Sequence, residues 1–148
     1  RLIITATRKP RPLSLERPRG REPAFGPCID WKAGRWRPLS DASPNAQDRF
    51  ARGRRNYGRT FLSQHVTNHP GVPLDQPIRT ITTKDQWTIV DGDVDRPLTE
   101  REHARGMGFA DSFRWPAGLA RTEVIAGLGN AIPPGMGRDA VDAVGNLI

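Results

Sequence analysis

The stretch RPLTEREHARGMGF, residues 96–109, carries the clearest local structural signal of the sequence. Thr99 and Glu102 have the spacing of a capping box, in which each side chain accepts a hydrogen bond from the backbone N–H of the other residue. A short helix is therefore expected to begin near Glu100 and to end at one of the two glycines of GMG. The apolar staple that often accompanies such a start is missing, because His103 occupies its position.

Toward the C-terminus, LGNAIPPGMGRDAVDAV (residues 128–144) places Gly-Asn and two prolines directly before a second helical pattern. Val141, Val144 and Ile148 recur at helical spacing and share one face. Two prolines constrain the backbone more than a helix cap requires. The segment therefore predicts a turn with a role of its own, followed by a helix.

The segment PIRTITTKDQWTIVDGD (residues 77–93), which precedes the helix expected at Glu100, is rich in β-branched residues. Side chains alternate over residues 79–82, the pattern breaks at residues 84–86, and an apolar run resumes at residues 87–90. This pattern predicts a β-hairpin or two adjacent strands.

A further helix is predicted by SPNAQDRFARGRRNYG, residues 43–58, in which Ser43 is the N-cap and a proline takes the first helical position. Ala46, Phe50 and Ala51 are expected on its buried face. Four arginines lie largely away from that face: Arg49, Arg52, Arg54 and Arg55.

The beginning of the sequence, RLIITAT, predicts a buried strand. Because the chain opens on such a strand and without methionine, we expect it to be the later part of a longer polypeptide. Residues 9–27 are rich in proline and arginine and predict an extended connector or arm without regular structure.

Length and composition favour one loop-rich domain, since the 148 residues include 14 prolines and 15 glycines. No apolar run approaches the roughly 20 residues that span a bilayer, and no signal-peptide pattern is present, so we expect a soluble, cytoplasmic protein without membrane contact. The single cysteine cannot form an internal disulfide, which fits a reducing compartment.

Charge is distributed unevenly along the chain. Residues 1–59 hold 15 Lys and Arg against 5 Asp and Glu, whereas residues 60–148 hold 8 against 11. Of the 23 basic residues, 20 are arginine, whose planar guanidinium matches phosphate oxygens and the guanine edge. The excess indicates a polyanionic partner, nucleic acid first. The alternative is arginine-rich codon usage that produces an ordinary solvated face.

Residues 96–113 match the motif R-x-L-T-x-R-E-x-A-R-L-Q-G-F-P-D-x-F at eleven positions. This is the ninth motif of the cytosine-5 DNA methyltransferases, and the chain resembles that family through Arg96, Leu98, Thr99, Arg101, Glu102, Ala104, Arg105, Gly108, Phe109, Asp111 and Phe113. Gly106 and Met107 replace the usual Leu-Gln, so the helix is expected to end a turn early.

Three other segments extend the resemblance. GLGNAIPP resembles the tenth motif, Gly-Asn-Ala/Ser-Val-Pro-Pro, and RLIITATR resembles the strand of the eighth. LDQPIRTITTKDQW resembles the Thr-Ile-Thr-Thr element that is common in the target-recognition domain between those motifs. Together they are similar to the C-terminal part of a bacterial or phage restriction–modification methyltransferase.

The resemblance implies an α/β fold, made of the C-terminal fragment of a Rossmann-like, S-adenosylmethionine-dependent methyltransferase domain and a loop-rich α+β target-recognition domain. The last strand region of the catalytic domain would occupy residues 1–8, and the DNA-reading region residues 9–95. The ninth-motif helix and its connection would occupy residues 96–127. The tenth-motif turn, with a helix that packs back on the catalytic domain, would occupy residues 128–148.

The implied cofactor is S-adenosylmethionine, and the implied partner is double-stranded DNA. By resemblance, Asn130 and Ala131 bind the methionine end of the cofactor. Arg1 would be the last arginine of the Gln-x-Arg-x-Arg signature in the eighth motif and would lie in the substrate site.

Two sets of residues are candidates for DNA binding. Phosphate contacts are predicted for Arg49, Arg52, Arg54, Arg55 and Arg59. The alternative for this set is a solvated helix face. Base or sugar contacts are predicted for Arg79, Thr80, Thr82, Thr83 and Lys84. The alternative for this second set is simple strand pairing.

The sequence lacks the residues that the family uses for chemistry. Its nucleophile in Pro-Cys-Gln, its Glu-Asn-Val and its Phe-x-Gly-x-Gly turn are absent. Cys28 follows a proline but precedes isoleucine, so we expect an inert small side chain. The chain alone, which we expect to be monomeric, should not methylate DNA. The missing catalytic region would come from the same polypeptide upstream or from a partner chain.

Two other functions fit the same residues. One is a catalytically inactive, sequence-specific DNA-binding module, and the other is a small basic RNA-binding or packaging protein. A metal site at His65 and His69 is not expected, because no third ligand is evident. Core or interdomain packing is predicted for Trp31, Trp36, Trp87 and Trp115.

Overall fold

The computed structural model describes residues 23–145. It contains two units, which are described separately: one extends to Ala131 and the other starts at Ile132. Several predictions fall outside the described residues, namely the strand at residues 1–8 with Arg1, most of the connector at residues 9–27, and the position of Ile148.

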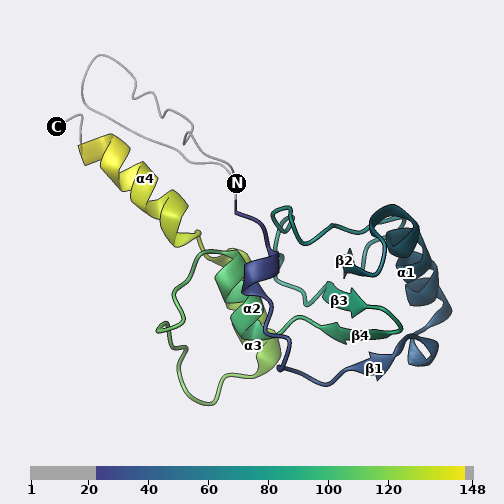
Figure 1. The fold of residues 1–148 in the computed structure, drawn as a ribbon. Coiled ribbons are helices and arrows are strands. Elements are labelled where there is room, and N and C mark those ends of the chain that lie inside the picture. The colour runs from purple at the N-terminus through teal and green to yellow at the C-terminus, as the bar shows by residue number, and fades with distance from the viewer. Residues whose placement is uncertain (1–22, 146–148) are drawn as a thin grey trace. The chain divides into compact units, whose positions relative to one another are not determined.

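The first unit is built on one antiparallel sheet with the strand order β1-β4-β3-β2 (Figure 1). Its strands are β1 (Arg37–Pro38), β2 (Thr60–Gln64), β3 (Trp87–Asp91) and β4 (Val94–Pro97). The strand predicted at residues 87–90 is confirmed as β3, which pairs with β2 on one side and β4 on the other. The strand predicted at residues 79–82 is wrong, because that segment is irregular. The described residues form a mixed α/β fold, and its Rossmann-like part stays a prediction.

The helices of the first unit are η1 (Gly26–Cys28), η2 (Leu39–Asp41), α1 (Pro44–Tyr57), α2 (Glu100–Gly106) and α3 (Arg121–Asn130). The predicted start of α1 at a proline after Ser43 is confirmed, although the Ser43 side chain makes no capping hydrogen bond. In α2, both hydrogen bonds of the predicted capping box are present. The helix α3 was not predicted.

The second unit contains α4 (Pro134–Gly145), which confirms the helix predicted after the two prolines. The Gly-Asn before it was predicted as part of a turn. Gly129 and Asn130 instead form the last turn of α3, and the helix ends at Ala131, whose backbone is extended. The helical path continues through Gly-Asn because Ala131 N–H still donates to the carbonyl of Gly127, at 2.9 Å.

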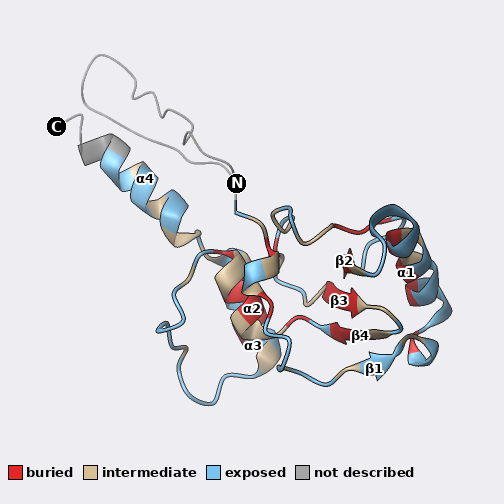
Figure 2. Cartoon of the chain, viewed as in Figure 1, coloured by how far each residue is buried: buried red, intermediate tan, exposed pale blue. Residues whose placement is uncertain are grey.

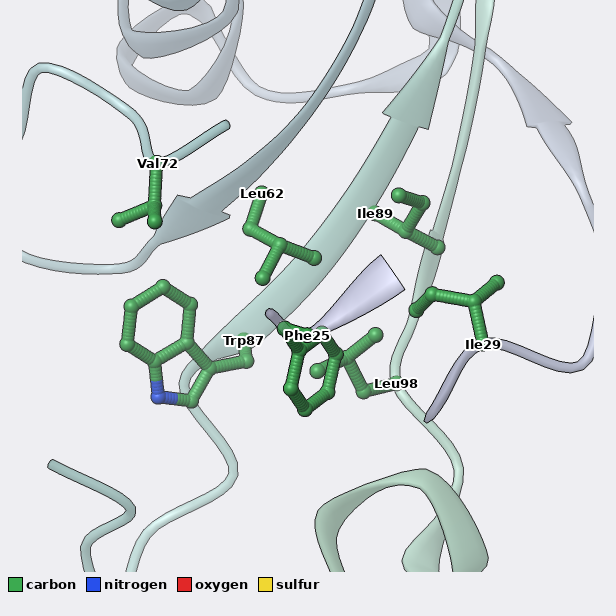
Figure 3. Close-up of a cluster of buried hydrophobic side chains, with 7 residues drawn as sticks. All are labelled: Phe25, Ile29, Leu62, Val72, Trp87, Ile89 and Leu98. Atoms are coloured by element: carbon green, nitrogen blue, oxygen red, sulfur yellow. The ribbon is translucent and has the colours of Figure 1, made fainter. Parts of the chain in front are cut away.

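Both faces of the central strands are covered. Phe61 and Val90 pack with Phe50 of α1 on one face. On the other face, seven side chains converge (Figure 3): Phe25, Ile29, Leu62, Val72, Trp87, Ile89 and Leu98. Burial is concentrated in β2, β3 and the middle of β4, and in residues of α1, α2 and α3 (Figure 2). Successive strand side chains point to opposite faces, so β2 and β3 are buried on both sides.

The contact between α1 and β2 depends on a glycine. Ala46 and Phe50 are buried as predicted, but Ala51 is exposed. Gly53 takes its place on the buried face, and a Cβ atom there would lie 2.1 Å from the Phe61 ring. The helix approaches the strand this closely only because no side chain intervenes.

Phe25, at the end of the predicted connector, is 1% exposed and packs against α2. A Cβ atom on Gly106 would lie 2.4 Å from the Phe25 ring. The leucine that is usual at this motif position would therefore clash with the ring. This packing explains why the motif departs from its pattern at Gly106. The helix α2 ends at that residue, as expected.

The first unit is held together at its centre by a buried ion pair. Arg96 donates two hydrogen bonds to the Glu102 carboxylate, with Nη2–Oε1 at 2.6 Å and Nη1–Oε2 at 2.8 Å, and both side chains are 0% exposed. The carboxylate also accepts from the backbone N–H groups of Asp30 at 2.9 Å and Thr99 at 2.7 Å. Arg96 Nη2 donates to the Asp30 carbonyl at 2.8 Å. The pair therefore connects the end of β4, the start of α2 and the loop after η1.

The same arginine shapes the loop that leads to β1. Its guanidinium lies 4.9 Å from the centre of the Trp36 ring. Gly34 has φ of +73° and lies beside the arginine, where a Cβ atom would be 2.9 Å from Arg96 Cδ. Only glycine adopts this backbone conformation and leaves room for the arginine.

The Glu102 carboxylate is ionised in this setting. Burial on its own would raise the pKa of Glu102, but hydrogen bonds from Arg96, Thr99 and Asp30 outweigh burial and hold that pKa below its usual range. An ionised Glu102 stabilises the fold above its ordinary pKa of 4.5, and the contribution is lost as the pH falls through the lower folded value.

Glu102→Gln should destabilise the chain by about 3–5 kcal/mol, because it leaves the Arg96 charge buried without its counter-ion. Urea unfolding followed by circular dichroism measures the change. Asp93→Asn is the matched control, since it removes one carboxylate from the exposed Arg54–Asp93 pair and should change the stability little. Equal effects of the two substitutions would contradict the structural role of the buried pair.

The stability difference between the wild type and Glu102→Gln should also depend on pH. It should be constant at neutral pH and shrink as the pH falls below 4.5, because the unfolded wild type then takes up a proton before the folded state does. Urea midpoints measured from pH 7 to pH 3 test this. Parallel curves for the two proteins would show that the Glu102 pKa is not lowered by folding.

Candidate nucleic-acid interface

The arginines predicted to contact phosphate fall into two groups. Arg54 and Arg59 bind acidic residues at the β3–β4 turn. Arg54 Nη2 lies 3.0 Å from Asp93 Oδ1 and also donates to the Gly92 carbonyl, and Arg59 Nε lies 3.1 Å from Asp91 Oδ1. Their charges are partly neutralised within the protein, so they are weaker candidates for phosphate contacts.

The other arginines of this set have no carboxylate partner in the part of the chain that the structure describes. Arg49 and Arg52 are half-buried on α1, and the Nε atom of each is buried without a hydrogen-bond partner among the described residues. Burial lowers the pKa of Arg49, and the neighbouring Arg52 lowers it further. Arg55 is fully on the surface. An anion placed beside Arg49 and Arg52 would relieve the repulsion between them.

His69 adds a hydrogen-bond donor close to these cations. Its Nδ1 accepts from the backbone N–H of Gly71 at 3.1 Å, so the neutral ring carries its proton on Nε2, which is buried without a partner in the described region. Its ring stands edge-on to Trp87. Burial lowers the pKa of His69, and the charges of Arg79 and Arg49 lower it further. The sequence pattern gave no signal for this donor.

The two histidines considered as a metal pair have separate partners. His65 Nε2 lies 2.9 Å from Thr88 Oγ1 on β3, whereas His69 bonds the backbone of its own loop. Among the described residues, no group of three potential ligands is placed to hold a metal ion.

The second predicted set lies in an irregular loop, residues 79–86, which we call the recognition loop. Four of its five predicted contact residues are exposed, namely Arg79, Thr80, Thr83 and Lys84. Thr82 differs, because its hydroxyl accepts from Lys84 N–H at 3.2 Å and lies 3.2 Å from Gln86 Oε1. That hydroxyl stabilises the loop itself.

The recognition loop is fixed at its inner side. Trp87 Nε1 donates to the Thr80 carbonyl at 3.4 Å. Ile81 is buried in a cluster with Ala104 and Met107 at α2 and with Val124 and Leu128 of α3. The exposed side chains therefore extend from a backbone that is already ordered, which lowers the entropic cost of binding.

The residues predicted to bind the cofactor lie at the end of α3. The Asn130 side chain is exposed, and an amide offers both a donor and an acceptor. Ala131 is half-buried against the cluster around Ile81. Their contact with a methionine moiety stays a prediction.

A family model described as C-5 cytosine-specific DNA methylase matches residues 32–146. The chain belongs to the C-5 cytosine-specific DNA methylase family. Neither curated proteins nor solved structures give a significant match. No helix in the described part of this methylase chain is long and apolar enough to cross a membrane.

Cys28 of this methylase chain is not an activated thiol. Burial raises its pKa, and the nearby Arg105 only partly opposes that effect. Arg105 is itself bound to Asp111, with Nε–Oδ1 at 2.7 Å. The cysteine is therefore protonated at neutral pH, in line with the inert role predicted for it.

The four tryptophans have different environments. Trp87 is in the core, and Trp115 packs under Arg101, whose guanidinium carbon is 4.5 Å from the ring centre. Trp31 is 48% exposed and stacks on Trp36 at 6.3 Å between ring centres. Packing inside the described unit therefore accounts for three of them, and Trp31 is the exception.

The double substitution Arg49→Gln/Arg52→Gln should weaken binding to duplex DNA and reduce the slope of log K against log salt by about 2, since each lost phosphate contact removes about 0.9. The control Arg54→Gln/Arg59→Gln removes the same charge from arginines that are already paired with Asp93 and Asp91 and should reduce the slope less. Fluorescence anisotropy of a labelled duplex at several salt concentrations measures both. Equal reductions would show that internal ion pairing does not distinguish the two groups.

Proposed function

We propose that this chain is the target-recognition region and the closing segment of a DNA (cytosine-5)-methyltransferase. Such an enzyme transfers the methyl group of S-adenosylmethionine to carbon five of a cytosine that has been flipped out of a specific duplex site. The observation that carries the proposal is the ordered recognition loop with its outward Arg79, Thr80, Thr83 and Lys84, in a chain of the methylase family.

Within this enzyme, different residues of the chain would contact the phosphates and the bases of the DNA. Arg49, Arg52 and Arg55 would contact phosphates and set the position of the protein on the duplex. The exposed side chains of the recognition loop would contact base edges or sugars. Thr82 would act from inside the loop by holding its turn.

The covalent step needs groups that the printed sequence lacks. The chemistry requires a cysteine thiolate that adds to ring carbon six, and a glutamate at ring nitrogen three. Neither Pro-Cys-Gln nor Glu-Asn-Val occurs in this chain. We assign these groups to a separate catalytic segment, upstream in the same polypeptide or in a partner chain.

This chain would complete the cofactor site. When bound, S-adenosylmethionine supplies the methyl group. The Asn130 amide and the backbone of Ala131 would hold its methionine end, and Arg1 would contact the substrate cytosine. On α4, Met136 is 41% exposed and Val141 is 70% exposed, which supports packing of this helix against the catalytic segment.

The second candidate is a catalytically inactive, sequence-specific DNA-binding module. The same loop and the same arginines favour it, because binding a duplex needs no nucleophile. The two candidates differ in whether a catalytic segment restores methyl transfer.

Methyl transfer from labelled S-adenosylmethionine to a duplex library should be absent for this chain alone and should appear when a polypeptide bearing Pro-Cys-Gln and Glu-Asn-Val from the same source is added. The polypeptide without this chain is the control and should be inactive or unselective. Transfer by this chain alone would disprove the assignment of the nucleophile to another segment. Selective DNA binding without transfer in the mixture would favour the inactive module.

A further inference from the structure

The helix α3 contacts the recognition loop at both of its ends. At the start of α3, Arg121 binds Asp85 of the loop, with Nη2–Oδ2 at 2.6 Å and Nε–Oδ2 at 3.0 Å. Arg121 also binds Glu100 of α2, with Nη1–Oε2 at 2.8 Å, and donates to the Leu98 carbonyl at 2.5 Å. One arginine therefore ties the last part of the loop to α2 and α3 together.

At the other end of α3, the helix meets the backbone of the loop directly. A Cβ atom on Gly129 would lie 2.4 Å from both the carbonyl carbon of Thr82 and the amide nitrogen of Thr83. The atoms it would meet belong to a peptide bond, so no flexible side chain can move aside. The glycine is required here by the recognition loop.

A second glycine of the same helix shows that this contact is specific. Gly127 lies two residues earlier, and a Cβ atom there would have nothing within 4 Å. Glycine inside a helix costs up to about 1 kcal/mol relative to alanine. At Gly129 that cost has a structural reason, whereas at Gly127 the described structure gives none.

We propose that Gly129 and Arg121 are positioning residues for DNA sequence recognition. This inference rests on the proposed function, because it assumes that the recognition loop reads the duplex. The helix α3 sets the path of residues 82–85 from both ends, and Ile81 is inserted between α2 and α3. Sequence preference therefore depends on two residues that lie behind the DNA-contacting surface.

The expected displacement is large enough to alter base readout. Restoring ordinary contact at about 3.4 Å would move the Thr82–Thr83 peptide by about 1 Å. Hydrogen bonds to base edges tolerate only a few tenths of an ångström around 2.9 Å. Contacts from Thr83 and Lys84 would lose their geometry, while attraction to phosphates, which varies slowly with distance, would persist.

Selection from a library of duplexes with a randomised centre tests the proposal on the full chain. The wild type and the matched control Gly127→Ala should enrich the same sequence. Gly129→Ala should lose at least tenfold of the preference for that sequence over a scrambled duplex. Its affinity for the scrambled duplex at low salt should stay within twofold of the wild type. Circular dichroism shows whether each variant is folded.

A second variant covers the case in which Gly129→Ala does not fold. Arg121→Gln releases the loop at Asp85 without adding volume, and Arg138→Gln, an exposed arginine of α4, is its charge-matched control. Arg121→Gln should lose preference and Arg138→Gln should keep it. Unchanged preference in a folded Gly129→Ala, or in Arg121→Gln when Gly129→Ala is unfolded, overturns the positioning role and leaves the proposed function intact. A wild type that enriches no sequence overturns both.

Discussion

The buried pair of Arg96 and Glu102 is the interaction on which the rest of the first unit depends. Hydrogen bonds to Asp30, Pro97 and Thr99 replace most of the water that both charges lose, although Arg96 Nε is buried without a partner among the described residues. Because a buried charge without its partner is costly, the three segments that supply these groups must assemble together. Ala104 of α2 and Met107, which follows the helix, then pack in the cluster that holds the recognition loop. Within this motif, Arg96 and Glu102 thus form an internal anchor and do not face the solvent.

Local signals in the sequence predicted α1, α2 and α4, because a cap depends on residues three or four positions apart, but they missed α3. Of the strands, β3 was predicted, whereas β1, β2 and β4, which depend on pairing between separate segments, were not. The alternation at residues 79–82 looks like a strand, but Ile81 is buried by helices and makes no ladder. In β4, Asp95 and Arg96 look like surface residues, yet both are buried because Arg37 and Glu102 bind them. Arg37 lies 58 residues from Asp95, beyond any local pattern. Glu102 lies 6 residues from Arg96 in the same motif, where the sequence predicted it only as part of the capping box.

At the candidate site, too, the sequence predicts residue types, whereas the contacts that those residues make depend on distant segments. The sequence predicted one basic set of arginines, and the structure divides that set according to carboxylates on the distant β3–β4 turn. It also treated the tenth-motif glycine as a feature of the cofactor turn. The structure places that glycine against the Thr82–Thr83 peptide, so the motif that carries the predicted cofactor residues also contacts the recognition loop. The sequence motif alone does not predict this contact, because the loop that fills the space beside Gly129 lies more than 40 positions upstream.

The contact between Phe25 and Gly106 bears on how such recognition regions are exchanged during evolution or engineering. The ring fills the volume that a larger motif residue would occupy, so the two positions form one unit although 80 residues separate them. A chimera with a relative that is joined between residues 25 and 106 separates these two positions. It would place either a larger residue at position 106 against the Phe25 ring, or Gly106 beside a void where the ring is missing. Crossover points that preserve the fold must therefore lie before residue 25 and after residue 106.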